Sequence, residues 1–474
     1  MLSNDAVWSS VRELGDAIRT RKVSPVELTE AYLKRLETIG PQLNAVVTVT
    51  RELAMTQARA AEKEIMAGKY RGPLHGIPWG AKDAFATKGI LTTWGTAPYK
   101  NQVPDYDAAI VTSLHDAGAV LIGKLAMVEL VGGLGFDSAD NSFTGPGRTP
   151  WNRDYFTGGS SSGPGAATAA ALVAFSIGGE TGGSILQPSS HCGLSGIRTT
   201  YGRVSRYGAV TLCWTLDKIG PMCRTADDCG LVLNAIAGYD KRDEATTRRK
   251  FTYTTKPPKG KRFKLALPRG AAERAQPEVA ANFQKSLEVL KSFADVEEVD
   301  FPDYPYNAIL GTLLRAEGTA AFRDLVDTGR MRELQNHADR INGYIGMTIS
   351  AVDYLQAQRV RRLARVALDE QLAKYDAMIG PTITAVSGPV DQPFNQGQGR
   401  GTGAAPAGPG ATPLTPAGNV SGTPALTVPN GFGRNNIPTG LQFMGSAWSE
   451  STLLALGNAW QEATDWHKKR PPIS

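Results

Sequence analysis

The sequence predicts an α/β protein built on a large mixed, mostly parallel twisted sheet that is covered by helices. Three observations lead to this fold class. Helix-like segments alternate with short apolar runs typical of buried strands, as in residues 107–124 and 166–178, and this alternation is typical of sheets covered by helices. An apolar content of 41% and a charged content of 20% are those of an ordinary globular protein. A chain of 474 residues is long enough to bury a core of that size.

The N-terminal part of the chain, residues 1–66, is predicted to be a helical segment. Residues 24–27, Ser-Pro-Val-Glu, form a capping box with proline at the first helical position. The Gly-Pro pair at 72–73 ends this region. The apolar, glycine-rich residues 74–83 that follow are predicted to form a strand.

That predicted strand contains one lysine, Lys82. A lysine on an exposed strand edge would be unremarkable, but the residues around this one are largely apolar, namely Ile77, Trp79, Ala81 and Phe85. A buried lysine tends to lose its proton, and a catalytic base requires the unprotonated state. The pattern therefore indicates a candidate base, with a solvated surface lysine as the alternative.

Two glycine- and serine-rich segments follow. Residues 157–163 read Thr-Gly-Gly-Ser-Ser-Ser-Gly and residues 180–185 read Glu-Thr-Gly-Gly-Ser-Ile, and the small-residue run 165–177 between them is predicted to be a helix. Glycine pairs let the backbone approach a ligand closely, and successive amide groups in such turns form anion-binding concavities. The segments could therefore bind a phosphate or hold a nucleophile beside an oxyanion hole.

The remainder of the chain returns to helices and strands. Residues 240–350 are predicted to be a helical excursion, and residues 393–413 a flexible loop, because a composition so rich in Gly and Pro cannot pack a core. The other predicted elements are helices at 278–293, 350–374 and 451–466 and strands at 263–267 and 375–381. We expect all of them to belong to one domain over residues 1–474.

Two familiar motifs fit the serine-rich segments poorly. Residues 159–163 match the G-x-S-x-G elbow of α/β-hydrolases, but residues 150–157 do not predict the buried strand that must precede it. The later histidines, His191, His337 and His467, come with no supporting pattern. A phosphate-binding loop needs a lysine after its glycines, and none follows. A serine activated by a neutral lysine is the more coherent combination, because a lysine whose pKa is lowered to ~7–8 can take the serine proton.

Composition limits the function and location. The net charge of +6 is small for this length and no run of Lys or Arg concentrates it, so nucleic-acid binding is not indicated. The N-terminus shows no secretory signal and no segment is apolar enough to cross a bilayer, so we expect a cytoplasmic protein with no membrane partner. The four cysteines match no zinc or redox spacing, so we expect buried free thiols, no metal and no cofactor.

Four motifs taken together resemble the amidase signature family. They are residues 76–83 (Gly-Ile-Pro-Trp-Gly-Ala-Lys-Asp), 158–163 (Gly-Gly-Ser-Ser-Ser-Gly), 181–185 (Thr-Gly-Gly-Ser-Ile) and 193–203 (Gly-Leu-Ser-Gly-Ile-Arg-Thr-Thr-Tyr-Gly-Arg). The resemblance runs from about residue 24 to about residue 471, and the combination is far more specific than any single motif. It implies the family's fold, with helices on both faces of the sheet.

The resemblance also implies the roles of the site residues. Lys82 would be the base and Ser184 the nucleophile that accepts the acyl group. Ser160, joined to Gly159 by a cis peptide bond, would relay the proton between them, and the 24-residue separation of the two serines agrees with the family's spacing. The backbone amides of Thr181, Gly182, Gly183 and Ser184 would form the oxyanion hole.

Two residues beside the predicted nucleophile depart from the family pattern. Glu180 stands where an Asp is usual, and Leu186 stands where an Arg is usual. We expect Leu186 to remove a cation and leave an apolar wall, which favours an uncharged acyl group. The predicted substrate contacts are Gly159, Phe136 and Trp214, with Trp79 and Trp94 as further aromatic candidates that could equally belong to the core.

The predicted function is a serine hydrolase that cleaves small uncharged amides, aryl amides or carbamates (urethanes), and also esters. We expect a small-molecule substrate as its partner and no nucleic acid, and a homodimer is compatible with the sequence. The alternative is the amidase subunit of a tRNA-dependent amidotransferase, which carries similar motifs, although Leu186 and residues 350–359 argue against it. A binding module with a dead site is disfavoured because Lys82, Ser160 and Ser184 are all present.

Overall fold

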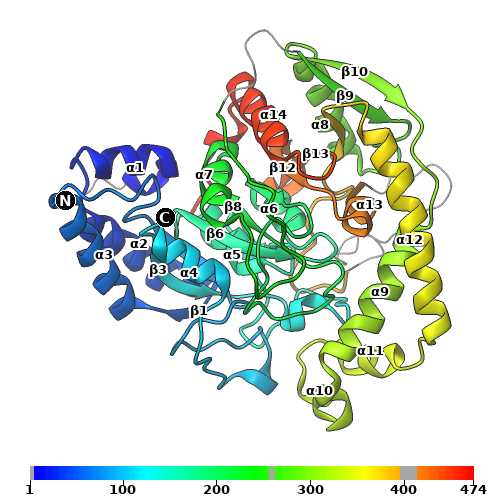
Figure 1. Cartoon of the computed structure of the whole chain (residues 1–474), viewed down its shortest axis with the longest axis horizontal. Helices are drawn as coiled ribbons and strands as arrows, with labels where there is room; N and C mark the ends of the chain where they lie inside the picture. Colours follow the sequence, from blue (N-terminus) through cyan, green and yellow to red (C-terminus); the bar gives the residue numbers. More distant parts are fainter. Residues whose placement is uncertain (1–4, 256–261, 395–413, 474) are drawn as a thin grey trace.

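A computed structural model describes residues 5–255, 262–394 and 414–473. Its main feature is an 11-stranded sheet in the order β1-β3-β2-β6-β8-β7-β12-β13-β11-β9-β10, with helices on both sides (Figure 1). This architecture confirms the predicted α/β class with a large mixed sheet covered by helices, although antiparallel pairs outnumber parallel ones. The strands of this sheet are β1 Val46–Val49, β2 Pro78–Lys82, β3 Val120–Leu125, β6 Phe175–Glu180, β7 Ser195–Arg198, β8 Lys218–Cys223, β9 Phe263–Pro268, β10 Ala294–Val299, β11 Ala377–Pro381, β12 Ala425–Phe432 and β13 Pro438–Met444.

Parallel and antiparallel pairs occupy different parts of the sheet. Strands β3, β2 and β6 are parallel towards one end, and β11, β9 and β10 are parallel at the other. The strands between them, from β6 through β8, β7, β12 and β13 to β11, pair antiparallel. Strand β1 closes one edge antiparallel to β3.

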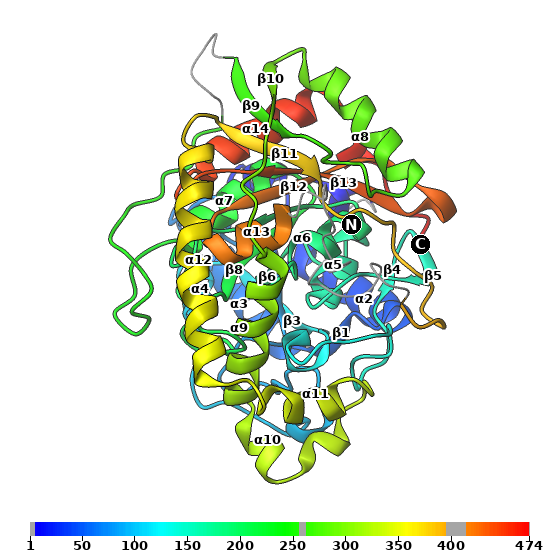
Figure 2. The ribbon, with the colours of Figure 1, turned by 90° about the vertical axis from the view of Figure 1, so that its right-hand side faces the viewer.

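The helices form layers over this sheet. They are α1 Val11–Arg19, α2 Pro25–Ile39, α3 Arg51–Met66, α4 Ala109–Asp116, α5 Ser162–Ala169, α6 Leu186–Cys192, α7 Ala226–Ile236, α8 Pro277–Leu290, α9 Tyr306–Ala321, α10 Arg323–Asp327, α11 Asp339–Gly346, α12 Ala351–Leu372, α13 Leu414–Ser421 and α14 Glu450–Ala463. Figure 2 shows α9 and α12 side by side in front of the sheet, with α13 behind them. Two of the predicted helix starts are confirmed, because the Ser24 and Ser350 side chains accept backbone hydrogen bonds at the starts of α2 and α12.

Strand alternation separates the two largest apolar clusters of the described residues, which lie on opposite faces of the sheet. Ile379 of β11 and Phe443 of β13 belong to the larger cluster, which also contains residues of α7, α8 and α14. Their neighbours Met378 and Met444 point the other way, into a second cluster with α9, α12 and α13. Successive side chains of a strand face opposite sides, so these apolar runs require cover on both faces.

Two local predictions are wrong, and a third is confirmed. Residues 165–177 are not one helix, because α5 ends at Ala169 and the chain enters β6 at Phe175, between β2 and β8. The helical N-terminal segment contains strand β1. Residues 152–156 form a strand, β5, but it pairs only with β4 (Arg148–Thr149) outside the main sheet and is mostly not buried. The prediction that residues 150–157 do not supply the buried strand of an α/β-hydrolase elbow is therefore confirmed.

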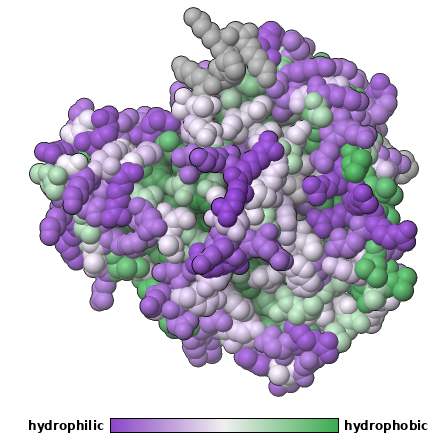
Figure 3. All heavy atoms as spheres, viewed as in Figure 1, coloured by the Kyte–Doolittle hydropathy of each residue, from purple (hydrophilic) through white to green (hydrophobic). Residues whose placement is uncertain are grey.

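The remaining sequence-based expectations concern the surface and the thiols. The four cysteines are free and buried. Among the described residues, no helix has both the length and the apolarity to cross a membrane. Helix α12 is exposed along one side, where apolar residues contribute to the green edge seen in Figure 3; these residues are Val352, Leu355, Leu363 and Val366. Residues 395–413 of the predicted 393–413 loop lie outside the described residues.

Candidate active site

Lys82 is the last residue of β2 and its side chain is completely buried. Alternation along the strand places it on the face opposite Trp79 and Ala81, which belong to the larger apolar cluster. Its Nζ lies 2.8 Å from the Ser160 Oγ and 3.2 Å from the Gly179 carbonyl oxygen. The lysine that the sequence singled out therefore contacts the first of the two serine-rich segments directly.

Ser160 lies in the loop that precedes α5, and the bond between Gly159 and Ser160 is cis. Its carbonyl accepts a hydrogen bond of 3.1 Å from the Val128 amide. The next residue, Ser161, connects the two serine-rich segments, because its amide donates to the Ser184 carbonyl at 3.2 Å. Its hydroxyl donates to the Gly179 carbonyl at 3.3 Å. These bonds keep the loop of Ser160 and the loop of Ser184 in contact.

Ser184 lies in the loop between β6 and α6 and is 6% exposed. Its hydroxyl forms no hydrogen bond within the described chain, and it lines a cavity of about 440 Å³. In the same part of the structure, the amides of residues 181–184 also donate to no other described residue, and Gly183 adopts a φ of +133°. Unpaired amide groups beside a hydroxyl are able, as a chemical arrangement, to stabilise a developing oxyanion.

Glu180, at the end of β6, organises the loop that carries Ser184. Its Oε2 accepts hydrogen bonds from the amides of Ile185 at 2.8 Å and Leu186 at 3.0 Å. Its Oε1 accepts from the Arg198 guanidinium at 3.1 Å and the Asn419 amide at 3.0 Å. Arg198 and Glu180 are both fully buried. A carboxylate that accepts four hydrogen bonds in the interior fixes the start of α6 in place.

Leu186 does not form the apolar substrate wall that the sequence suggested. Its side chain is fully buried in the second apolar cluster, among residues such as Leu212 and Met444, and it lines neither of the two cavities described below. The missing cation of the family pattern therefore changes the core beneath the nucleophile, and the walls of the cavities come from other residues.

Asp217 is a site residue that the sequence reasoning missed. It accepts a hydrogen bond of 2.6 Å from the Thr181 hydroxyl and two of 2.9 Å from the amides of Leu212 and Cys213. These bonds connect the loop of predicted oxyanion donors to the loop that carries Trp214. The signal in the sequence is the Asp-Lys pair, 217–218, at the start of the otherwise apolar strand β8.

Burial lowers the pKa of Lys82 to about 7 from its ordinary value of 10.5. The nearby carboxylates of Asp217 and Glu180 oppose this effect, because a negative charge favours the protonated amine. Burial likewise lowers the pKa of Lys218 to about 7 and raises the pKa of Asp217. A lysine with this pKa is largely unprotonated at and above neutral pH, and an unprotonated amine is able to accept a proton.

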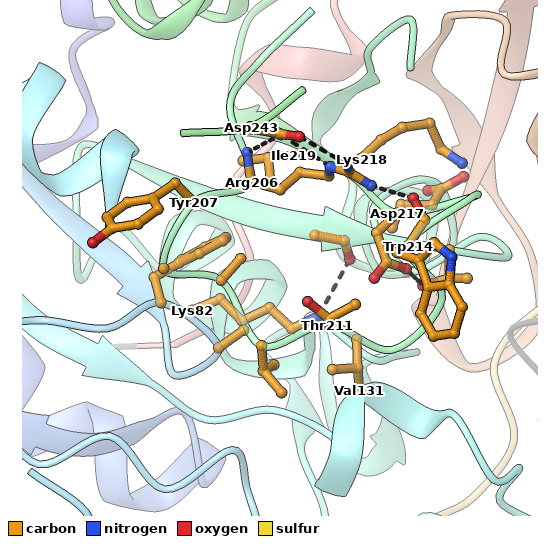
Figure 4. A pocket seen from close by; sticks show the side chains of 18 of the residues that line it. Lys82, Val131, Arg206, Tyr207, Thr211, Trp214, Asp217, Lys218, Ile219 and Asp243 are labelled. Carbon is orange, nitrogen blue, oxygen red and sulfur yellow. Dashed lines mark hydrogen bonds and ion pairs between the residues drawn. The ribbon is translucent and has the colours of Figure 1, made fainter. Parts of the chain in front are cut away.

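Two neighbouring cavities reach the candidate site, and Val131 and Thr181 line both of them. The one that reaches Lys82 has a volume of about 260 Å³ and several charged residues in its lining. In Figure 4 the ion pair of Arg206 and Asp243 lies on one side of this cavity and Trp214 on another. The second cavity, about 440 Å³, reaches Ser184 and is bordered by Phe136, the loop of residues 131–137 and helices α9 and α11.

The aromatic residues named from the sequence fall into two groups. Phe136 lines the cavity of Ser184 and Trp214, 44% exposed, lines the cavity of Lys82. Trp79 is buried and stacks on Phe175, and Trp94 packs against Tyr99, so these two belong to the fold. Gly159 lines neither cavity, but a Cβ at this position would lie 2.5 Å from the Val128 side chain, so the close packing here requires glycine.

Comparisons of the sequence with a family model and with known proteins agree on one family. A family model described as Amidase matches residues 27–454. Proteins named as the A subunit of glutamyl-tRNA(Gln) amidotransferase are similar over nearly the full length. The one from Dehalococcoides mccartyi is 34% identical over 99% of this chain and 100% of its own, and the one from Geobacter metallireducens is 35% identical over 98% and 99%.

Solved structures agree with that family. A structure described as a vestigial protein complex that reveals the origins of an s-triazine catabolic enzyme superimposes with a TM-score of 0.87 and 26% identity over 96% of this chain and 98% of its own. A bacterial aryl acylamidase gives a TM-score of 0.83 with 25% identity over 97% of each chain. The peptide amidase of Stenotrophomonas maltophilia gives 0.82 with 29% identity over 98% of each chain.

The curated relatives contradict the expected partners. We expected a small molecule alone and no nucleic acid, but these relatives are named as subunits of an enzyme of glutamyl-tRNA. The low net charge misled the prediction, because it argues only against a basic surface that binds nucleic acid directly. One subunit of a larger assembly can act on a group attached to RNA without such a surface of its own.

Proposed function

Because the chain belongs to the amidase family, we propose that Ser184 attacks the carbonyl carbon of an amide, is acylated, and releases ammonia or an amine. Lys82 is the base in this proposal and Ser160 transfers the proton. The observation that carries it is the 2.8 Å contact between the Lys82 Nζ and the Ser160 Oγ in an interior where the pKa of the lysine is about 7. A neutral amine in contact with a serine is the arrangement that activates a hydroxyl nucleophile.

The proton and the bonds balance in two steps. As the Ser184 Oγ bonds to the carbonyl carbon, its proton moves to the Ser160 Oγ, and the Ser160 proton moves to the Lys82 Nζ. The same path returns a proton to the leaving nitrogen when the C–N bond breaks. A water molecule then attacks the acyl carbon, and Lys82 again takes a proton through Ser160. As the ester bond to the Ser184 Oγ breaks, that proton returns to the serine and the carboxylic acid is released. The Ser184 hydroxyl has no hydrogen-bond partner among the described residues of the free protein, whereas the Lys82–Ser160 contact is already formed. Hydrogen bonds between catalytic groups often form or tighten only when substrate binds.

The tetrahedral oxyanion would be stabilised by the amides of residues 181–184. This assignment is supported by the amides themselves, because none of the four donates to another described residue. It is also supported by the hydrogen bonds of Asp217 and Glu180, which fix the loop of residues 181–185 at both ends. Removing a single donor from such a site typically lowers the rate by ~10²–10³.

The two cavities suggest how a substrate is oriented. The leaving nitrogen receives its proton from the side of Ser160 and Lys82, so we assign the cavity with Trp214 to the leaving group. The acyl group then occupies the larger cavity at Ser184, where Phe136 and Leu212 offer apolar contacts. This assignment favours small uncharged amides, aryl amides and carbamates, and it admits esters, whose leaving oxygen occupies the same position.

The amidase subunit of a tRNA-dependent amidotransferase is the second candidate, and the comparisons give it more support than they give the free hydrolase. Two curated relatives at 34% and 35% identity and nearly complete coverage bear that name. In this role the same Ser184 chemistry would release ammonia from an amide donor, and partner subunits would deliver it to a glutamyl group on tRNA. The chemistry at Ser184 is common to both candidates, and only the acyl donor and the fate of the amine differ.

One experiment separates these candidates. The purified chain is assayed with an anilide, an aryl carbamate, an ester and glutamine, each with and without ATP, glutamyl-tRNA(Gln) and the B and C subunits of a bacterial amidotransferase. Turnover of the anilide or carbamate by the chain alone supports the hydrolase, and glutamine turnover that requires the added components supports the amidotransferase role.

Serine variants test the shared chemistry. Ser184→Ala should lower kcat by about 10⁶ with every substrate. Ser189→Ala is the matched control, because its hydroxyl, like that of Ser184, is buried without a hydrogen-bond partner among the described residues but lines neither cavity, and it should retain activity. Equal turnover by Ser184→Ala and wild type would remove Ser184 from its proposed role.

A further inference from the structure

Two buried carboxyl groups lie beneath the cavity of Ser184 and take no part in the proposed chemistry. Glu129 belongs to the short 3-10 helix η4, Glu129–Gly132, and Asp339 is the first residue of α11. Both side chains have no exposed surface. Each residue is close to a wall of the cavity: residues 131–137 follow Glu129, and Ala338 and Asn342 lie on either side of Asp339. The two positions are far apart in the sequence and meet only in the folded chain.

The hydrogen bonds of the two carboxyl groups are unequal. Glu129 accepts from the amides of Asn336 at 2.7 Å and Gln335 at 2.9 Å and from the Thr96 hydroxyl at 3.4 Å. Neither oxygen of Asp339 accepts a hydrogen bond from any described residue. A buried carboxylate without donors is very unfavourable, whereas a protonated carboxyl group can donate to a neighbouring carboxylate. Asp339 and Glu129 are such neighbours, and each affects the pKa of the other.

The charged groups around Asp339 also favour its protonated form. Burial raises its pKa well above the usual range, and the carboxylates of Glu129 and Asp137 raise it further. The adjacent Arg340 directs its guanidinium to the carbonyls of Leu334 and Gln335. Helix α9 and the short helix η5 (Arg330–Glu333) also pack against α11. On α9, Arg315 is exposed at the cavity, and Glu317 accepts hydrogen bonds from Thr215 and Tyr354. The charged residues of η5 are Arg330, Arg332 and Glu333.

The loop that Glu129 anchors needs to be held in place. Leu130 and Val131 adopt φ values of +48° and +64°, a left-handed conformation that is unfavourable for large or β-branched residues. Val128, on the other side of Glu129, donates its amide hydrogen bond to the Ser160 carbonyl. A shift of this loop would therefore change both the cavity wall and the support of Ser160.

We propose that Asp339 is a positioning residue whose carboxyl proton donates a hydrogen bond to Glu129 and so holds together the two walls of the Ser184 cavity, residues 131–137 and 338–342. The hydrogen bond exists only while the proton is present. When the proton leaves, two negative charges face each other in the interior, and α11 and the loop move apart. The inference rests on the proposed function only in assigning the cavity at Ser184 to the substrate.

The first test needs no turnover. Urea unfolding of wild type and Asp339→Asn is measured from about pH 5 to about pH 8. The folded pKa of Asp339 is raised, so the folded protein holds a proton that the unfolded chain releases above about pH 4, and wild-type stability is lost as the pH rises. The Asn amide donates to Glu129 at every pH, so the wild-type midpoint should fall relative to that of the variant. A constant difference across this range would overturn the proposal.

The matched control is Asp140→Asn. Asp140 is an exposed carboxylate on the same loop and accepts from the Gln335 side chain at 2.9 Å. Its midpoint should follow that of wild type. If Asp339→Asn does not fold, Glu129→Gln tests the same hydrogen bond from the other side, because the introduced side-chain amide donates to an ionised Asp339. This variant should weaken the pH dependence of the unfolding midpoint in the same way. An unchanged pH dependence of its midpoint would overturn the proposal.

The second test distinguishes positioning from simple stabilisation. If the walls must be closed for substrate to bind, KM should rise about tenfold for each pH unit above the pKa of the shared proton, while kcat changes little. Asp339→Asn should abolish this rise. The same rise in KM for wild type and Asp339→Asn would remove the positioning role even if the stability effect were present. If no substrate is turned over, the proposed function fails while the unfolding test still decides the fate of the Glu129–Asp339 pair.

Discussion

The pH dependence of acylation gives the most direct test of the proposed mechanism, because it reports the protonation state of Lys82. With a pKa of about 7, about half of the lysine is neutral at pH 7, whereas an ordinary lysine with a pKa of 10.5 would be neutral in about one molecule in 3,000. Burial therefore increases the available base about 10³-fold. The acylation rate should rise about tenfold per pH unit below pH 7 and level off above it.

The assay is single-turnover release of an aniline from a saturating anilide, which reports acylation and not binding. Asp217→Asn is the informative variant. The Asp217 carboxylate raises the pKa of Lys82, so its removal should move the rise in rate to lower pH, and Asn retains an oxygen that can accept from Thr181. Asp243→Asn is the control, because Asp243 lines the same cavity but pairs with Arg206. A flat profile from about pH 5 to about pH 9, or a midpoint near 10, would refute the assignment of Lys82 as the base.

Three further predictions follow from the same contacts. Lys82→Met should raise the free energy of unfolding by up to about 5 kcal/mol below about pH 7, because the buried lysine binds its proton less tightly than the unfolded chain does. The gain should vanish as the pH rises towards about 10.5, and urea unfolding at several pH values checks this. Glu180→Ala should lower the free energy of unfolding by about 3–5 kcal/mol, measured in the same way, because it leaves the buried Arg198 guanidinium without its carboxylate. Phe136→Ala should change the preference among acyl groups and Trp214→Ala the preference among leaving groups, as measured by kcat/KM over two substrate series; the opposite result would reverse the assignment of the two cavities.

Local sequence patterns anticipated the parts of the site that depend on short segments. The apolar run of residues 74–83 indicated a buried strand, and β2 places Lys82 at its end with an interior side chain. The glycine-rich loops were visible because close backbone packing restricts the residue type. The failure at residues 165–177 has a related origin: small residues are compatible with either structure, and the sheet contacts of β6 on both sides determine the outcome.

The contacts that tune the site could not be read from the sequence, because they join segments that are distant along the chain. Glu180 meets Arg198 and Asn419, and Glu129 meets the start of α11. Nothing in the spacing of these residues predicts such pairs, since a buried polar residue is recognised only when its donors and acceptors are located. The aromatic candidates show the same limit: Trp79 and Phe136 are both buried, but only Phe136 lines a cavity.

The hydrogen bonds of the two carboxylates near Lys82 explain how this lysine can stay largely neutral beside acidic groups. Each of them could hold the amine in its charged form, yet each is engaged elsewhere. Asp217 accepts from the Thr181 hydroxyl and two backbone amides. Glu180 accepts from a guanidinium, a side-chain amide and two backbone amides. Donors that surround a carboxylate offset its charge, so desolvation remains the largest influence on the lysine. The same two carboxylates fix the loop of the free amides, so the charge of the proposed base and the position of the proposed oxyanion donors depend on one set of hydrogen bonds.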